Sequence, residues 1–428
     1  MPDKRVEVRR TLKGDATNYW ERLVEFDISW HPNVQHCQIV ANDQGAIDRI
    51  FQDENGQQYQ ERLSYLSQTE GTIRYHMIKG IDSAQKYEAE INLTQDKDQT
   101  EITWSAQVTS DIQNLEQICA GTEAIFMNAI DEIKYFSPPK LQSNHQVSID
   151  HFIIEGSPRI TGLATTPNPC KPLIIFLHGI GGNASNWQPQ LEELGVDYPS
   201  IALNLRGYGD AELGISQTQL FDYFTDIIRT AEFWGHKKFI LVGLSYGAWI
   251  ATAFAQAYPS KLHALILAGG CTGMSEADPA EREAFMSARL EPLNNGLEPK
   301  DFAQKVVDII AGPNATNTQR NELFNSMSAI SSETYRDALY CFCNPTEKHN
   351  FSQITAPTFL ITGEHDSLAS PAEIKAVAHR MRYKRSENAG PVCFEIVQGA
   401  GHLCNIEAPR TFNQYLRNAF KLISQTHA

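Results

Sequence analysis

One pentapeptide constrains the fold of this 428-residue chain more than any other feature: the sequence Gly-Leu-Ser-Tyr-Gly at 243–247. It follows an apolar run at 239–242 and precedes a run of mostly small residues at 248–253. This order predicts a buried strand, a tight turn and a helix, with Ser245 held on the turn. Glycines fit the two ends of such a turn, because neighbouring elements leave no room there for a Cβ atom.

A second buried strand is predicted at 173–177, and it ends in the sequence His-Gly-Ile-Gly-Gly at 178–182. A serine hydroxyl becomes an effective nucleophile when backbone amides face the oxyanion that develops during attack. We expect the N–H groups of Ile180 and Tyr246 to form this oxyanion hole, and we expect Gly179 to contact the substrate.

Two further buried strands are predicted at 358–362 and 392–397, and each is followed by a residue whose side chain can serve in catalysis. Asp366 comes just after the first strand, at the edge where ligands gather in open parallel sheets. His402 comes after the second strand on a glycine-rich approach. We expect His402 to act as the base for Ser245 while Asp366 orients its imidazole ring.

Each of these residues has a competing interpretation. Ser245 also fits a helix-starting serine, and His402 an ordinary loop histidine. Asp366 also fits a helix cap or a surface carboxylate, with Glu364 as the alternative acid, and His365 is the competing histidine. Trp187 is predicted to contact the substrate, although a large aromatic residue near a strand end is more often part of the core.

From about residue 147 to 425 the chain resembles the α/β-hydrolase superfamily, on the order serine, acid, histidine and the strands that precede them. The HGxGG loop, the GLSYG turn and an insertion of four-helix size are most similar to the 3-oxoadipate enol-lactonase, non-haem haloperoxidase and carboxylesterase group. The resemblance implies a mostly parallel sheet and the triad Ser245, Asp366 and His402. No cofactor or metal is expected.

The sequence departs from this family in one strand and turn, at 203–211. Asn204 and Ala211 stand where the family has Asp and Ser. Those positions are usually structural, so the change concerns local hydrogen bonds more than catalysis.

About 80 residues with helical character separate the strand at 262–267 from the strand that begins near Pro357. The predicted helix starts are Asp278-Pro279, Glu298-Pro299, Thr318 and Ser332. In an α/β-hydrolase this block, about 271–350, would be a cap that excludes water and shapes the pocket. Arg289 and Arg336 are candidates to bind a substrate carboxylate, although such arginines are more often solvated.

In the first 136 residues the hydrophobic pattern has a different period, which predicts a separate domain. Polar and apolar residues alternate at 62–66, 87–93 and 102–108, which is typical of antiparallel strands with one solvated face. Asn55-Gly56 predicts a hairpin turn. Apolar residues from Leu115 to Ile133 then recur every three or four positions, which predicts one long amphipathic helix.

This order predicts an α+β helix-grip fold, an antiparallel sheet around a long C-terminal helix. Residues 20–24, 29–34 and the closing helix resemble the SRPBCC superfamily, in its polyketide cyclase/dehydratase-like branch. A small apolar ligand between sheet and helix and a packed core are both compatible with the pattern. The residues expected on the inner face are Trp30, His31, Tyr65, Tyr75, His76, Tyr87 and Trp104.

The change in hydrophobic period along the chain predicts the domain boundaries: an SRPBCC/START-like domain at 1–136, a proline-containing linker at 137–146 and the hydrolase domain at 147–428.

The composition, with 42% hydrophobic and 20% charged residues, is that of a globular protein. The eight cysteines show neither zinc spacing nor a dense disulfide framework. Neither a signal peptide nor a membrane span is recognised, so we expect a cytoplasmic protein. A formal charge of −15 without a basic cluster disfavours nucleic acid as a partner.

These features predict a serine hydrolase that cleaves a small-molecule ester or lactone through an acyl-enzyme. Hydrolysis of a C–C bond and cofactor-free perhydrolysis use the same triad and remain alternatives. A non-catalytic receptor that keeps the triad is the alternative from another class. A serine at the turn excludes dehalogenase and epoxide-hydrolase chemistry, which need a carboxylate there.

Overall fold

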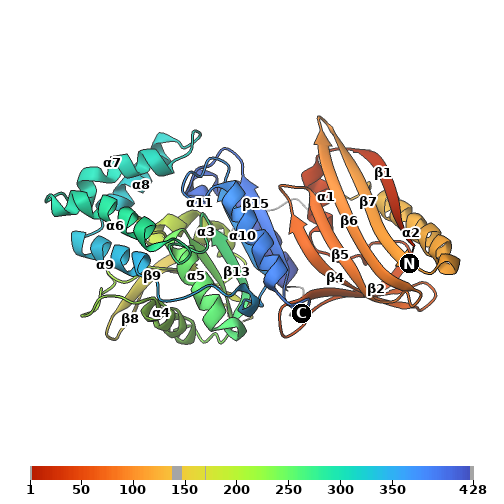
Figure 1. The fold of residues 1–428 in the computed structure, drawn as a ribbon, viewed down its shortest axis with the longest axis horizontal. Coiled ribbons are helices and arrows are strands. Elements are labelled where there is room, and N and C mark those ends of the chain that lie inside the picture. The colour runs from red at the N-terminus through yellow and green to blue at the C-terminus, as the bar shows by residue number, and fades with distance from the viewer. Residues whose placement is uncertain (1, 137–146, 169, 425–428) are drawn as a thin grey trace. The chain divides into compact units, whose positions relative to one another are not determined.

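The computed structural model describes residues 2–136, 147–168 and 170–424 (Figure 1). The chain divides into two compact units. One comprises 1–143 with 387–395 and 415–428, and the other comprises 144–386 with 396–414. The linker predicted at 137–146 lies outside the described residues.

The first unit contains a seven-stranded antiparallel sheet in the order β1-β7-β6-β5-β4-β3-β2. Its strands are β1 (Asp3–Lys13), β2 (Val34–Ala41), β3 (Ile47–Asp53), β4 (Gln58–Ser67), β5 (Thr72–Lys79), β6 (Ala84–Asp96) and β7 (Gln99–Ser110). Along β7 nearly every second residue is buried, as the alternation predicts. The turn at Asn55-Gly56 joins β3 to β4, and Gly56 has a φ of +82°, which glycine adopts without strain.

Two helices belong to this sheet, α1 (Ala16–Leu23) and α2 (Ile112–Ile133). Asp111 caps α2 by accepting a hydrogen bond from the Asn114 N–H. The helix packs on β1 and β7, where the rings of Trp104 and Phe126 stack with their centroids 5.2 Å apart. The antiparallel sheet predicted from the sequence is therefore confirmed, whereas the helix-grip assignment stays a prediction.

The second sheet has eight strands in the order β15-β14-β13-β12-β10-β11-β9-β8. The pairs from β11 through β10, β12 and β13 to β14 are parallel, and β8 and β9 add an antiparallel edge. The strands are β8 (Ile149–Ile154), β9 (Ile160–Thr165), β10 (Leu173–Leu177), β11 (Ser200–Leu203), β12 (Phe239–Leu244), β13 (Leu262–Ala268), β14 (Thr358–Gly363) and β15 (Val392–Val397). Residues of β10, β12 and β14 are buried throughout, because helices cover both faces of the sheet.

The register brings the carboxyl ends of the central strands to one edge. Leu177 pairs with Gly243, and Gly243 pairs with Leu267, so β10, β12 and β13 end together. Chain order reverses at β10, which lies between β11 and β12. Ligand sites of open α/β sheets form outside the carboxyl ends at such a reversal.

The remaining elements surround this sheet. They are α3 (Gln188–Leu194), α4 (Leu220–Phe233), α5 (Tyr246–Ala257), α6 (Pro279–Asn294), α7 (Pro299–Ile310), α8 (Asn317–Ser328), α9 (Ser332–Cys343), α10 (Pro371–Lys384), α11 (Cys404–Glu407) and α12 (Pro409–Ser424), with the 3₁₀ turns η1 (Ala184–Trp187), η2 (Pro259–Lys261) and η3 (Phe351–Gln353). The four helices α6 to α9 lie between β13 and β14 in the chain and group together beside the sheet (Figure 1). Their starts fall at or within one residue of the predicted positions, with Asp278 and Glu298 as N-caps before a proline.

Candidate active site

Ser245 lies on a strained turn between β12 and α5, as the pentapeptide predicts. Its φ of 55° and ψ of −113° are unusual for a residue with a side chain. A Cβ atom on Gly243 would overlap the carbonyl oxygen of Gly247, and one on Gly247 would overlap that of Leu177. The Ser245 N–H donates to the Ala268 carbonyl at 2.8 Å, which ties the turn to β13.

The structure brings Ser245, His402 and Asp366 together from three different loops. His402 Nε2 lies 2.8 Å from Ser245 Oγ, and its Nδ1 lies 2.9 Å from Asp366 Oδ2. Because the carboxylate can only accept a hydrogen bond, the ring carries its proton on Nδ1. Nε2 is then free to accept the Ser245 hydroxyl proton.

The environment of Asp366 keeps its carboxyl group ionised. Burial raises the pKa of this carboxyl, but the hydrogen bond and charge of His402 and two backbone amides outweigh burial, so its pKa is lowered. The two amides belong to Leu368 and Ala369, and each donates to Oδ1 at 2.9 Å. Asp366 is therefore held in one rotamer with Oδ2 facing the imidazole.

Glu364 and His365, the alternative acid and histidine, lie apart from the hydrogen-bonded group of Ser245, His402 and Asp366. Glu364 Oε2 and His365 Nε2 are 3.6 Å from each other, and nearly half of each side chain is exposed. Glu364 also accepts a hydrogen bond from the Gly399 N–H at 2.9 Å. Within the described part of the chain, neither side chain bonds to Ser245 or His402.

The backbone N–H groups of Ile180 and Tyr246 have no acceptor among the described residues. Tyr246 opens α5, where the first N–H groups have no partner within the helix. Gly179 borders Ser245, because a Cβ atom on Gly179 would lie 3.3 Å from the Ser245 Cβ. The Ile180 carbonyl accepts a hydrogen bond from the Tyr208 hydroxyl at 2.8 Å, which holds the loop in place.

His178 is a buried structural histidine at the start of this loop. Its Nδ1 lies 2.8 Å from the Gly179 carbonyl oxygen, and its Nε2 lies 3.1 Å from the Leu205 N–H, which donates to it. Burial lowers the pKa of His178 to about 4. The ring is therefore neutral at pH 7, with one nitrogen as donor and the other as acceptor.

A family model described as the alpha/beta hydrolase fold matches residues 172–409, more than half of the chain. The chain belongs to this family. The hydrolase is 27% identical over 260 residues to 2-succinyl-6-hydroxy-2,4-cyclohexadiene-1-carboxylate synthase of Serratia proteamaculans, covering 58% of this chain and 92% of that protein. It is 20% identical to 3-oxoadipate enol-lactonase 2 of Acinetobacter baylyi, covering 60% of this chain and 92% of that protein.

Solved structures show the same fold. A thermophilic esterase from Thermogutta terrifontis superimposes with a TM-score of 0.55 at 20% identity, covering 64% of this chain and 99% of that one. The 2-hydroxy-6-oxo-6-phenylhexa-2,4-dienoate hydrolase of Rhodococcus superimposes with a TM-score of 0.52 at 16% identity, with the same coverage.

Two predictions about side chains near the hydrolase site have a structural answer. Trp187 is 1% exposed and lies between Phe176 and Phe412, with ring centroids 4.8 and 6.1 Å away, so the geometry favours a packing role over a substrate contact. Asn204 makes both hydrogen bonds of its amide. It accepts from the Ala184 N–H at 2.9 Å and donates to the Thr161 hydroxyl at 3.0 Å, so both the oxygen and the nitrogen of the amide have a partner.

Sequence reasoning missed Glu407, which holds the loop of His402. Its Oε2 accepts the N–H groups of Gly401 and Gly312 at 2.9 and 2.7 Å, and its Oε1 accepts that of Leu403 at 3.2 Å. The His402 N–H donates to the Ile310 carbonyl at 2.8 Å. The backbone around His402 is thus tied to the end of α7 and to Gly312 just after it. An acidic residue five positions after His402 was the available signal.

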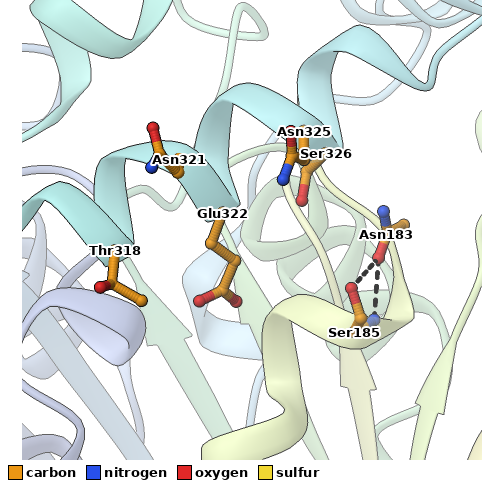
Figure 2. A pocket seen from close by; sticks show the side chains of 7 residues that line it. All are labelled: Asn183, Ser185, Thr318, Asn321, Glu322, Asn325 and Ser326. Carbon is orange, nitrogen blue, oxygen red and sulfur yellow. Dashed lines mark hydrogen bonds between the residues drawn. The ribbon is translucent and has the colours of Figure 1, made fainter.

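A polar cavity of about 490 Å³ lies between η1 and the cap helix α8 (Figure 2). All the residues that line it have polar side chains: Asn183, Ser185, Thr318, Asn321, Glu322, Asn325 and Ser326. Burial raises the pKa of Glu322. The nearby Asn186 amide donates to the Ser326 hydroxyl at 2.8 Å, which joins the cap helix α8 to η1.

The interior of the antiparallel unit combines aromatic rings with the ion pair of Arg49 and Glu61. The Arg49 guanidinium lies over the rings of Phe26 and Tyr75, 4.5 and 4.4 Å from their centroids, and its Nε donates to Glu61 at 2.5 Å. The Trp104 indole N–H donates to the Tyr75 hydroxyl at 2.8 Å. Tyr75 and Trp104 therefore face inward, as predicted.

Within residues 2–136, 147–168 and 170–424, no cluster of three or more His, Cys, Asp or Glu side chains is placed to hold a metal ion. In the same ranges, no helix combines the length and apolar character needed to cross a membrane.

Proposed function

We propose that this hydrolase cleaves a carboxylic ester or a lactone, enol-lactones included, by acyl transfer through Ser245. One observation carries the proposal. Ser245, His402 and Asp366 form a continuous hydrogen-bonded chain beside two amide donors that have no acceptor among the described residues. This is the arrangement that nucleophilic acyl transfer requires.

The reaction has two steps. Ser245 Oγ attacks the carbonyl carbon while His402 Nε2 takes the hydroxyl proton, and the Ile180 and Tyr246 amides stabilise the oxyanion. His402 then protonates the departing alkoxide or enolate, which leaves an acyl-enzyme on Ser245. Water, deprotonated by His402, cleaves this ester and releases the acid. Asp366 stabilises the imidazolium throughout and stays ionised.

The relatives support ester and lactone bonds as the first substrates to test, because they include an enol-lactonase and the structural neighbours include an esterase. Hydrolysis of a C–C bond and perhydrolysis need the same groups. An assay of each reaction with one enzyme preparation distinguishes these chemistries.

For the antiparallel unit we propose binding of a small apolar molecule and no catalysis. The aromatic inner face, with Tyr75, Tyr87 and Trp104 buried, supports an apolar ligand. The acid and base at its centre, Glu61 and Arg49, are engaged with each other, so neither is available to transfer a proton to a ligand.

The proposed reaction is tested with a fluorophosphonate probe, which forms a covalent bond with activated serines, followed by peptide mapping. We expect the label on Ser245 and hydrolysis of p-nitrophenyl acetate that the probe abolishes. A folded protein that neither takes the label at Ser245 nor hydrolyses any ester would overturn the proposal and favour the receptor alternative.

A further inference from the structure

Arg289, on the cap helix α6, is a partly buried cation without a carboxylate partner. Its guanidinium carbon lies only 3.3 Å from the centroid of the Phe285 ring. Its hydrogen bond to the Phe285 carbonyl is long, at 3.4 Å. No Asp or Glu of the described residues forms an ion pair with it.

Several other arginines of the described residues pair with a carboxylate. Arg62 bonds to Asp48 at 2.7 Å and Arg380 bonds to Glu276 at the same distance, and in each case the hydrogen bond to the carboxylate raises the pKa of the arginine. The pKa of Arg289 is shifted the other way, because burial removes water from the guanidinium and no acid compensates. A desolvated cation of this kind is costly for the folded protein unless an anion joins it.

The position of Arg289 connects it to the nucleophile through aromatic rings. The Phe285 ring lies 5.9 Å from that of Phe342 on α9, and the Phe342 ring lies 5.5 Å from that of Tyr246. Tyr246 directly follows Ser245 and supplies one of the two free amides. These three rings form an aromatic row that begins beside the nucleophile and ends under the guanidinium of Arg289.

We infer that Arg289 binds a carboxylate of the substrate, so that the hydrolase acts on esters or lactones that carry a carboxylate separated from the reacting carbonyl by an apolar portion. The inference rests on the proposed function of Ser245. The apolar portion would lie along the aromatic row. A monoanion fits better than a phosphate dianion, because a single guanidinium balances one negative charge and would leave the second uncompensated.

The inference is tested first with a matched pair of substrates, mono-p-nitrophenyl glutarate and p-nitrophenyl butyrate. They share the leaving group and a similar acyl chain and differ in the terminal carboxylate. We expect the wild-type kcat/KM to favour the glutarate ester, and Arg289→Gln to lower this preference by about 10- to 150-fold, as the loss of a hydrogen bond between charged groups predicts. Arg289→Lys, which keeps the charge without the planar fork, should fall between the two.

Arg336→Gln is the control, because Arg336 belongs to the same cap and bonds to the neutral Asn294 at an exposed contact, 2.7 Å away. It should leave the preference within about twofold of wild type. A wild-type enzyme that hydrolyses both esters without favouring the carboxylate would overturn the inference and leave the proposed function intact. So would an unchanged preference in a folded Arg289→Gln variant.

A binding measurement separates the inference from the chemistry of Ser245. In Ser245→Ala protein, calorimetry should detect tighter binding of monomethyl glutarate than of dimethyl glutarate, and adding Arg289→Gln should remove most of the difference. Equal affinities for the two esters in the Ser245→Ala protein would refute a carboxylate site even if no ester is ever hydrolysed.

Discussion

The antiparallel unit and the hydrolase unit each hold an arginine removed from solvent, and the two arginines differ in whether an acid compensates the charge. In the first, Arg49 and Glu61 are 3% and 4% exposed and bond to each other, so each charge is neutralised within the fold. In the second, Arg289 has no acid among the described residues, and Asp366 is committed to orienting His402. The difference teaches where to look for function: a charge that the fold leaves uncompensated is available to a ligand.

The largest expected effect lies in the hydrolase unit, at the proposed nucleophile. Ser245→Ala should lower kcat for an ester by about 10⁵ to 10⁶, since it removes the nucleophile. His402→Ala should match it, because the two residues act as a unit. Ester-hydrolysis assays measure kcat for both variants, and circular dichroism checks that each variant is folded. Residual activity above about one hundredth of wild type in Ser245→Ala would exclude Ser245 as the nucleophile.

Asp366→Asn should be milder, with kcat lowered on the order of 10⁴, because it disturbs the tautomer of His402 and leaves the base in place. Glu364→Gln is the matched control, since Glu364 is the neighbouring acid that pairs with exposed His365. We expect that variant to keep activity within about threefold. A larger loss in Glu364→Gln than in Asp366→Asn would identify Glu364 as the acid.

In the antiparallel unit, Glu61→Gln should cost about 3–5 kcal/mol of stability, because it leaves the Arg49 charge buried without a partner. Urea unfolding followed by circular dichroism measures this loss. Glu90→Gln provides the comparison, since Glu90 pairs with Arg74 on the surface and should cost below about 1 kcal/mol. If both substitutions cost the same, the buried pair has no special role in the fold.

Glu407→Gln should lower kcat by about 10- to 100-fold, because the loop of His402 would shift and a misplaced His402 would be a much less effective base. The substituted amide would turn an N–H₂ toward N–H donors that now bond to a carboxylate. A positioning role predicts a change in kcat with little change in KM. A variant that loses thermal stability but keeps kcat would show that Glu407 serves folding only.

The smallest effect concerns pH. His178 has a folded-state pKa of about 4 against an ordinary value of 6.5, so at pH 5 the unfolded chain binds a proton that the folded protein does not. Its contribution to stability is therefore complete above pH 6.5 and is lost as the pH falls toward 4. Urea unfolding should show about 2 kcal/mol less stability at pH 5 than at pH 7. His178→Gln, which cannot titrate, should flatten this dependence. An equal slope in that variant would assign the loss to other groups.

Much of the fold was predictable from local patterns. Strands β10, β12, β13, β14 and β15 lie where apolar runs predict them, and the cap helices begin at or beside their predicted starts. The alternation in the first 136 residues predicts the antiparallel sheet. These signals are strong because burial within one element repeats every two or every 3.6 residues, so a short stretch of chain contains the whole pattern.

Other features were beyond such patterns. The places of Trp187 in the core and of Glu407 between two loops depend on residues far away in the chain, such as Phe412 for the first and Gly312 for the second. Ion pairs inside the sheet are also beyond such patterns. The alternation of polar and apolar residues predicts which face of the sheet a side chain occupies, but it does not predict whether a charged side chain has a partner there.

By itself, then, the sequence determined the strand, turn and helix around Ser245 and the order in which Asp366 and His402 follow it. Only the tertiary structure decided that His402 lies within 2.8 Å of Ser245, that Glu407 holds its loop, and that Arg289 has no acid partner among the described residues. The physical reason is distance along the chain. Hydrophobic periodicity acts within an element, whereas hydrogen bonds between loops depend on the register of strands that are more than a hundred residues apart.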